Sequence, residues 1–398
     1  MKKIRIGIDA RFYGPIGKGL GRYTQEIVDN IIRISKDDPL VGRDDFDYVV
    51  FLSPENFDEF ADREGVLKIK IPYRWYSWGE QLFFPFIIWR SKLTLIHFPH
   101  FNVPLFVQTP FVVTIHDLIL THFPTLRATT RSRWIYYFKN FAYRLVIGSA
   151  LRRAMKIITV SKHAKQDIID QFKIAPDRIV VTYEGVSNLA KGRDSLFVAK
   201  LDKDETLARY HLPGDFLLYV GNAYPHKNLE ALLRVFSRLR RERLDLRLVL
   251  VGKSDYFYER LKKSAQALNL WQEANINSPA VFPGYVPDAQ LEILYGSARA
   301  YVFPSLYEGF GLPPLEAMAR SCPVASSDRA SLPEILGESA LYFNPEDEND
   351  ILVKIRQLLD DQILRSELIA RGLDRAKLYD WWECGRQTLD VYKSVLRV

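Results

Sequence analysis

The sequence predicts an α/β fold in which two doubly wound, Rossmann-like domains face each other across a cleft. The chain has 398 residues, which exceeds the roughly 250–300 residues at which a single hydrophobic core stops growing. Short apolar runs rich in β-branched residues alternate with helical stretches. These runs are continuously apolar, which is typical of parallel strands that are covered by helices on both faces.

The first domain is expected over residues 1–190 and the second over residues 191–378, with a helix near 381–396 in the closing segment 379–398. Predicted strands of the first domain are 4–8, 48–52, 93–98, 111–115, 157–160 and 179–182. Those of the second are 216–220, 246–251, 280–282, 300–303, 324–326 and 341–343. The polar stretch 188–212 suggests a linker.

Composition excludes few functions. Lys and Arg number 55 against 48 Asp and Glu, a net charge of +7, which fits nucleic acid, a phosphorylated substrate or an anionic membrane equally well. Cys322 and Cys384 are too few and too far apart for a disulfide framework, so a reducing cytoplasm is expected. No signal peptide and no apolar run of about 18 residues is visible.

Open parallel sheets bind ligands at the carboxyl ends of their strands, so the loops that follow strands are the candidate sites. After the first strand come Asp9, Arg11 and a series of glycines, with a helix expected from about Tyr23. The glycines are Gly14, Gly17, Gly19 and Gly21. They permit close approach to a phosphate, and a loop without a ligand is the alternative.

Two stretches, 72–92 and 127–155, mix large aromatic with basic side chains. Such a mixture is typical of a surface helix that touches anionic lipid. The alternative is that these aromatic residues belong to the core or to an acceptor pocket.

Histidines gather near predicted strand ends. They are His97, His100, His116 and His122. Asp117 is the only obvious carboxylate beside them, so no metal site is predicted. His116 directly follows a predicted strand and would lie at its tip over the cleft, with a buried structural histidine as the alternative. The acidic pair Asp45 and Asp47 is interpreted as part of a solvated loop.

In the second domain, three strand-end loops carry candidate donor-binding residues. Gly221 and Asn222 turn the chain, and Lys227 precedes a helix that begins near Asn228. An ordinary surface lysine is the alternative there. The other two loops carry Gly252 and Lys253, and then Gly284, Tyr285 and Val286 before a helix with Asp288 as its expected cap.

Residues 300–320 read as strand, loop and helix. Pro313 and Pro314 suit a first helical turn. Gly309 and Gly311 let the backbone approach a bound group, and a helix start favours an anion. Glu308 and Glu316 flank that position.

These motifs resemble the retaining glycosyltransferases of the GT-B fold, family 4, also called group 1. Glu308 and Glu316 match the family's E-x7-E motif within SLYEGFGLPPLEAMA. The segments IGIDARF, GLGRYT, TIHDL, ITVSKHAKQDI, YEGV, YVGNAYPHKN and FPGYVPDAQL match in the family's order. The closing DWWECGRQTLDVYKSVL resembles the helix that crosses back to the first domain in such enzymes.

The resemblance implies roles for individual residues. Glu308 would bind hydroxyls of the donor sugar, Glu316 the ribose, and Lys227 the leaving diphosphate, while His116 would lie near the transferred sugar's primary hydroxyl. The diphosphate would be held by the backbone of Gly309, Phe310, Gly311 and Leu312. Further expected donor-binding residues are Gly19, Asn222, Gly252, Lys253, Tyr285 and Val286.

One departure concerns Asn222, where many relatives carry arginine. Lys253 or Arg11 is expected to supply the missing charge. The form GN-x-x-P-x-KN resembles a subgroup associated with mannosyl transfer from GDP-mannose.

The function expected from the resemblance is metal-independent transfer of a hexose, best mannose from GDP-mannose or another nucleotide sugar, to a glycan or lipid-linked acceptor in surface polysaccharide (lipopolysaccharide) biosynthesis. No other cofactor and no nucleic acid partner is expected. The expected location is the cytoplasm, with peripheral contact to the inner face of the plasma membrane. The alternatives are a nucleotide-sugar epimerase of the same fold and a nucleotide-sugar-binding protein without catalysis.

Overall fold

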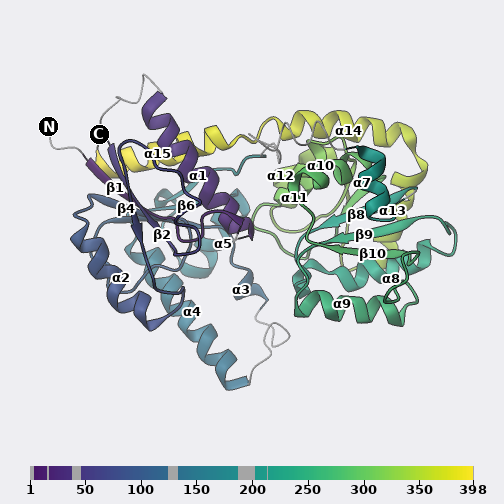
Figure 1. The fold of residues 1–398 in the computed structure, drawn as a ribbon, viewed down its shortest axis with the longest axis horizontal. Helices are drawn as coiled ribbons and strands as arrows, with labels where there is room; N and C mark the ends of the chain where they lie inside the picture. The colour runs from purple at the N-terminus through teal and green to yellow at the C-terminus, as the bar shows by residue number, and fades with distance from the viewer. Residues whose placement is uncertain are drawn as a thin grey trace. The chain divides into compact units, whose positions relative to one another are not determined.

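The chain divides into two compact units, each built on its own parallel sheet (Figure 1). Unit 1 contains Met1–Gly185 and Asp380–Val398, and unit 2 contains Val186–Tyr379. The computed structural model describes residues 4–15, 18–37, 46–123, 133–186, 202–212 and 214–397. Two doubly wound α/β sheets confirm the predicted fold class.

The sheet of unit 1 has seven parallel strands in the order β3-β2-β1-β4-β5-β6-β7. They are β1 (Ile4–Asp9), β2 (Phe46–Leu52), β3 (Val66–Lys70), β4 (Leu95–Phe98), β5 (Phe111–Ile115), β6 (Lys156–Thr159) and β7 (Ile179–Val181). The order reverses between β1 and β4. The loops after these two strands therefore flank the crevice that doubly wound sheets use for ligands.

Helices cover the sheet of unit 1. Helices α1 (Lys18–Asp37) and α15 (Trp381–Leu396) pack against each other. The remaining helices of the unit are α2 (Trp78–Arg90), α3 (Ile119–His122), α4 (Arg133–Arg153), α5 (Lys162–Phe172) and the short η3 (Pro176–Arg178). Phe84 and Ile88 of α2 share one hydrophobic core with Ile147 and Leu151 of α4.

The sheet of unit 2 has six parallel strands in the order β10-β9-β8-β11-β12-β13. They are β8 (Phe216–Val220), β9 (Arg247–Val251), β10 (Ala280–Gly284), β11 (Ala300–Phe303), β12 (Val324–Ser327) and β13 (Ala340–Phe343). Here the order reverses between β8 and β11, so the loops after these strands flank the corresponding crevice.

The helices of unit 2 alternate with its strands. They are α7 (Lys203–Arg209), η4 (Pro225–Lys227), α8 (Leu229–Leu239), α9 (Tyr256–Ala267), α10 (Asp288–Ser297), α11 (Leu312–Met318), α12 (Leu332–Leu336), η5 (Gly337–Ser339), α13 (Glu348–Asp360) and α14 (Gln362–Ala376).

Four details differ from the sequence-based expectation. Asp47, expected in a solvated loop, lies in β2 and is half-buried. Strand β3 was not predicted. Helix α1 is assigned from Lys18 rather than Tyr23, so Gly19 and Gly21 lie in its first turns. Asp288 is the first residue of α10 and Pro287 takes the capping position. Gly17, Asp45, residues 127–132 and most of the expected linker lie outside the described residues.

None of the helices in the described ranges is both long enough and apolar enough to cross a bilayer.

Candidate functional site

The loops after β8 and β11 meet through Lys227 and Glu308. The Lys227 Nζ atom lies 2.5 Å from Glu308 Oε1, and the two side chains are only 12% and 10% exposed. The backbone N–H of Leu306 also donates to the carbonyl of His226 at 2.8 Å. A cation and a carboxylate of separate loops are thus paired at the point where the strand order reverses.

Local backbone geometry positions Lys227. Pro225 begins the short helix η4, and Asn228 follows Lys227 with φ +58°. Asparagine tolerates this left-handed conformation better than most residues. Its Nδ2 donates to the carbonyl of Pro345 at 2.8 Å. The turn is therefore anchored on both sides of the lysine.

Ser331 and Gly311 fix the backbone of the loop that carries Glu308. The Ser331 hydroxyl lies 2.9 Å from the carbonyl of Glu308 and 3.0 Å from that of Phe310. Gly311 has φ +107°, and a Cβ atom there would lie 2.8 Å from Leu332 Cδ2. Only glycine suits this position, and helix α11 starts at the next residue, Leu312.

Glu316 lies one turn into α11 and is buried. The Tyr295 hydroxyl of α10 donates to its Oε2 at 3.3 Å. Arg320 donates to the backbone carbonyl of Glu316 at 3.2 Å and pairs with Glu292 at 2.5 Å. The carboxylate of Glu316 is therefore held by a neighbouring tyrosine, in a region where Arg320 adds positive charge.

The remaining predicted donor-binding residues of unit 2 lie on the loops after β8, β9 and β10. The N–H of Gly221 donates to Val251 and that of Gly252 to Gly284, at 3.0 and 3.1 Å. A Cβ atom on Gly252 would lie 2.2 Å from the Gly221 carbonyl, so this glycine is needed for loop packing. Lys253 is exposed.

Two further residues follow β10. Tyr285 is 70% exposed, whereas the side chain of Val286 is buried. On the loop after β8, Asn222 Oδ1 accepts the backbone N–H of Tyr224 at 3.3 Å.

In unit 1, His116 follows β5 and both of its ring nitrogens are engaged. Nδ1 lies 3.1 Å from Glu184 Oε1, and Nε2 lies 3.0 Å from the carbonyl of Pro99. Burial disfavours the imidazolium, but Glu184 and the Pro99 carbonyl outweigh burial and raise the pKa of His116. As an imidazolium, His116 donates to both acceptors, so a substrate hydroxyl would have to share or replace one of them.

The other histidines have protein partners. His97 lies 2.6 Å from the Tyr392 hydroxyl and 2.8 Å from Thr114 Oγ1, and burial lowers the pKa of His97 to about 3. His122 pairs with Asp167 at 2.7 Å. Within the part of the chain that the structure describes, no three His, Cys, Asp or Glu side chains are grouped as a metal ion requires.

Gly19 and Gly21, in the first turns of α1, differ in their surroundings. No atom would lie within 4 Å of a Cβ on Gly19, whereas a Cβ on Gly21 would lie 2.1 Å from the carbonyl of Gly14. The Gly14 carbonyl lies so close that only glycine fits at position 21, whereas position 19 has room for a side chain. The sequence alone could not distinguish these two glycines.

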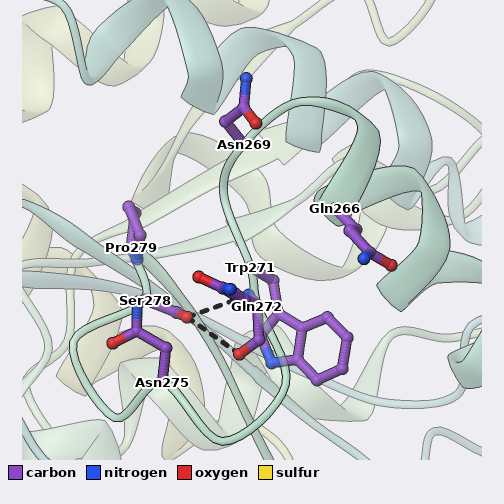
Figure 2. A pocket seen from close by; sticks show the side chains of 7 residues that line it. All are labelled: Gln266, Asn269, Trp271, Gln272, Asn275, Ser278 and Pro279. Carbon is purple, nitrogen blue, oxygen red and sulfur yellow. Dashed lines mark hydrogen bonds between the residues drawn. The ribbon is translucent and has the colours of Figure 1, made fainter.

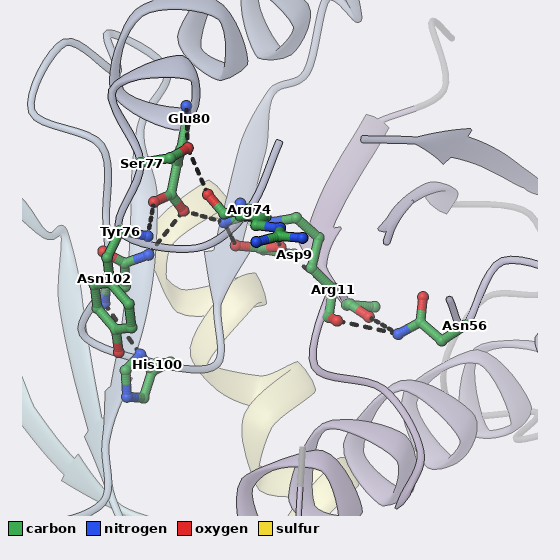
Figure 3. A network of polar contacts seen from close by, with 10 residues as sticks. Asp9, Arg11, Asn56, Arg74, Tyr76, Ser77, Glu80, His100 and Asn102 are labelled. Atoms are coloured by element: carbon green, nitrogen blue, oxygen red, sulfur yellow. Dashed lines mark hydrogen bonds and ion pairs between the residues drawn. The ribbon is translucent and has the colours of Figure 1, made fainter. Parts of the chain in front are cut away.

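The sequence did not predict a buried ionic network that lies at the switch point of unit 1, where the strand order reverses between β1 and β4. Arg11 pairs with Asp9 and with Glu80 at 2.7 Å each, and its side chain is fully buried (Figure 3). Burial opposes the charge, but the two carboxylates outweigh it and raise the pKa of Arg11. Asn102 Nδ2 donates to Glu80 at 2.7 Å. Arg11 is thus held in an ion-pair network of unit 1, whereas Lys253, the other cation expected to supply the charge at Asn222, is exposed.

A cavity of about 340 Å³ lies elsewhere in unit 2 (Figure 2). It is lined by Gln266, Asn269, Trp271, Gln272, Asn275, Ser278 and Pro279. These residues join the end of α9 to the start of β10, so the cavity lies at the amino end of that strand. It contains none of the predicted site residues.

Comparison with known proteins assigns the chain to a family of enzymes. The family "Glycosyl transferases group 1" matches residues 206–375, and "Glycosyltransferase Family 4" matches residues 42–188. The chain belongs to the group 1 glycosyltransferases, as its motifs and GT-B fold class led us to expect.

Named relatives extend this assignment. The chain is 33% identical over 305 residues to O-antigen chain mannosyltransferase B of Escherichia coli, a match that covers 75% of this chain and 74% of that protein. It is 27% identical over 299 residues to O-antigen chain mannosyltransferase RfbU of Salmonella typhimurium, covering 74% and 73%. A match of 32% identity to serotype-specific mannosyltransferase WbdA of Escherichia coli covers 62% of this chain but only 29% of that longer protein.

Solved structures share the fold. Sucrose-phosphate synthase from Thermosynechococcus elongatus superposes with a TM-score of 0.74 at 20% identity and covers 99% of this chain and 100% of that one. WaaG, a glycosyltransferase involved in lipopolysaccharide biosynthesis, gives a TM-score of 0.69 at 13% identity, with 98% and 99% covered. Anabaena HepE in complex with UDP and glucose gives 0.68 at 17%, with 98% and 100% covered.

Proposed function

We propose that this glycosyltransferase moves mannose from GDP-mannose, with retention at the anomeric carbon, to a glycan or lipid-linked acceptor of a surface polysaccharide. The observation that carries the proposal is the largely buried Lys227–Glu308 pair, which lies where the strand order of unit 2 reverses. The names of the relatives, O-antigen mannosyltransferases, support the choice of sugar and pathway. The GN-x-x-P-x-KN loop supports GDP-mannose as the donor.

The chemistry follows from the charges. As the bond between the anomeric carbon and the diphosphate oxygen breaks, negative charge grows on the leaving phosphate, and Lys227 is proposed to neutralise it. Backbone N–H groups of residues 309–312 are proposed to hold the diphosphate. Glu308 then binds hydroxyls of the sugar and Glu316 binds the ribose. Lys253 is proposed to share the charge that an arginine at Asn222 would carry.

Retention is proposed to arise from attack on the face that the leaving group departs from. The acceptor oxygen forms its bond to the anomeric carbon as the phosphate leaves, and the acceptor proton passes to the departing phosphate oxygen. This step needs no protein nucleophile and no divalent metal. His116, charged through Glu184, is proposed to contact the primary hydroxyl of the transferred sugar.

The first prediction concerns Lys227→Ala and Glu308→Gln. We expect each to lower kcat for transfer from GDP-mannose by about 100-fold or more, since preorganised charges at the reacting centre supply terms of this size. Product formation with radiolabelled GDP-mannose measures the rate. The matched control is Lys262→Ala with Glu259→Gln, an exposed Lys–Glu pair in the same unit at 2.8 Å, which should leave the rate unchanged.

Three results would contradict the proposal. Near-normal transfer by either variant would remove the site assignment. Activity lost with EDTA and restored by a divalent ion would remove the metal-free mechanism. Stabilisation by UDP or ADP sugars but not by GDP-mannose in a thermal-shift screen would rule out GDP-mannose as the donor. A bound ligand stabilises the folded protein by RT ln(1 + [L]/Kd), so the true donor should raise the melting temperature.

A further inference from the structure

Helix α2 of unit 1 is apolar on two opposite faces. Its core face is formed by Glu80, Phe84 and Ile88, which are buried. The opposite face carries Trp78, Leu82, Phe86 and Trp89, exposed by 81%, 57%, 56% and 68%. Their spacing of four, four and three residues places them in one stripe along the helix. We call these four side chains the outer stripe.

The outer stripe is unusual for a protein surface in water. Single exposed apolar side chains are normal, but contiguous exposed apolar patches mark interaction sites. Phe86 and Trp89 also contact each other, with ring centroids 5.7 Å apart. A helix that is apolar all round belongs in a core or in contact with a membrane, and α2 has only one of its faces in the core.

Along the sequence, the charges on either side of the outer stripe are nearly all positive. Residues 65–116 contain five Lys or Arg and one acid, Glu80, which is buried and paired with Arg11. Arg74, Arg90 and Lys92, at the two ends of α2, are exposed. The sequence then contains no Asp or Glu between Asp117 and Asp167. A partner of this surface must therefore accept aromatic rings and carry negative charge.

Helix α4 extends the same character. It shares the core beneath α2 through Ile147 and Leu151, so both helices cover the same side of the sheet. Phe141 and Leu145 are exposed by 65% and 44%, and Arg144 between them is exposed as well.

We propose that the outer stripe of α2, together with Phe141 and Leu145 of α4, docks the protein on an anionic lipid bilayer. Trp and Phe rings enter the boundary between headgroups and acyl chains, while flanking Lys and Arg side chains contact anionic headgroups. The arrangement fits lipid better than nucleic acid, because the outer stripe itself is apolar and its cations, at the two ends of α2 and at Arg144 of α4, flank the apolar side chains.

A buried anchor orients the docking helix. Ser77 caps α2 by accepting the N–H of Glu80 at 3.2 Å, and Glu80 Oε2 accepts the N–H of Tyr76 at 2.7 Å. Glu80 Oε1 binds Arg11 and Asn102, which follow β1 and β4 (Figure 3). Glu80 thus connects α2 to the two loops at the switch point of unit 1. These contacts fix the position of the loops relative to the helix that would touch the bilayer.

The test is flotation of the full chain with vesicles of equal parts phosphatidylcholine and phosphatidylglycerol. We expect binding at low salt, weaker binding at high salt, and little binding to phosphatidylcholine alone. The double variant Trp78→Ser with Trp89→Ser should bind at least about tenfold less. The matched control, Leu244→Ser with Ile363→Ser, replaces side chains of unit 2 exposed by 70% and 74% and should bind normally.

A second readout locates the contact. Brominated acyl chains should quench tryptophan emission in the original chain and much less in the Trp78/Trp89 double variant, whose thermal-shift response to GDP should be unchanged.

The proposal is overturned if the original chain does not float at low salt, if the double variant binds like the original, or if the unit 2 control loses binding equally. A dimer that the double variant abolishes, without vesicle binding, would assign the stripe to self-association. Vesicle binding does not depend on the donor, so loss of the GDP-mannose proposal would leave this one intact.

Discussion

At the scale of single residues, the clearest pairing is that of His116 with Glu184. The two are 68 positions apart, and the sequence placed His116 at a strand tip without revealing its partner. Glu184 lies in the YEGV segment that marked the family resemblance, yet no role was predicted for it. Its carboxylate raises the pKa of His116 and keeps the ring charged over a wider range of pH.

The second prediction follows from this pair. A histidine whose folded pKa is raised contributes stability that is fully present below its ordinary pKa and lost as pH rises through the folded pKa. We expect Glu184→Gln to lower the titration midpoint of His116 in histidine NMR spectra. His122, which pairs with Asp167, serves as the internal control. An unchanged midpoint for His116 would show that Glu184 does not hold its charge.

At the scale of elements, the sequence predicted twelve of the strands that the structure describes. It missed β3, whose residues VLKIK at the sheet edge carry two lysines and so lack the continuous apolar run of a central strand. It also placed the start of α1 too late, because glycines suggested a loop. Loop partners such as Glu80 with Arg11 stayed unpredicted, since they depend on strand order.

The third prediction concerns this anchor of α2. Glu80→Ala leaves the buried Arg11 guanidinium without its second carboxylate, and breaking a buried ion pair costs about 3–5 kcal/mol. We expect a correspondingly lower midpoint of urea unfolding for the full chain. The control Glu64→Ala removes an exposed acid from the same unit and should change little. Equal effects of the two substitutions would mean that the network contributes nothing specific.

At the scale of the whole molecule, fold class and family were predictable because they rest on features spread along the chain. The arrangement of predicted site residues was less so. The sequence indicated that Lys227 and Glu308 would lie on strand-end loops, but their contact at 2.5 Å follows from β8 and β11 being neighbours in the sheet. Likewise, the aromatic character of 72–92 was visible, whereas the division of α2 into a core face and an exposed stripe required the structure.

The fourth prediction is acid sensitivity in both units. Burial lowers the pKa of His97 in unit 1 to about 3 and, with the charge of Lys227, that of His226 in unit 2 to about 4. Between these values and the ordinary 6.5, the unfolded chain binds protons that the folded chain does not, so stability falls as pH falls. Each histidine should cost about 1.4 kcal/mol per pH unit below that value.

Thermal unfolding at pH 7.5 and 5.5 checks this expectation. His97→Gln retains hydrogen-bonding groups toward Tyr392 and Thr114 but cannot titrate, so its melting temperature should depend less on pH than that of the original chain. His116 changes the stability in the opposite direction between its ordinary pKa and pH 7.5, but it is present in both proteins, so its contribution cancels in the comparison. A pH dependence identical in both proteins would exclude His97 as a source.

Helix α15 has a consequence for the order of events during synthesis. It completes unit 1, where its Trp381 and Tyr392 are buried. The Tyr392 hydroxyl also forms a hydrogen bond with the ring of His97 in β4. Yet the ribosome makes α15 only after every residue of unit 2. Domains generally fold as units while the chain emerges, so unit 2 can reach its native packing first. Until α15 is made, the surface of α1 that packs against it stays uncovered, and transiently exposed apolar surface of this kind favours aggregation.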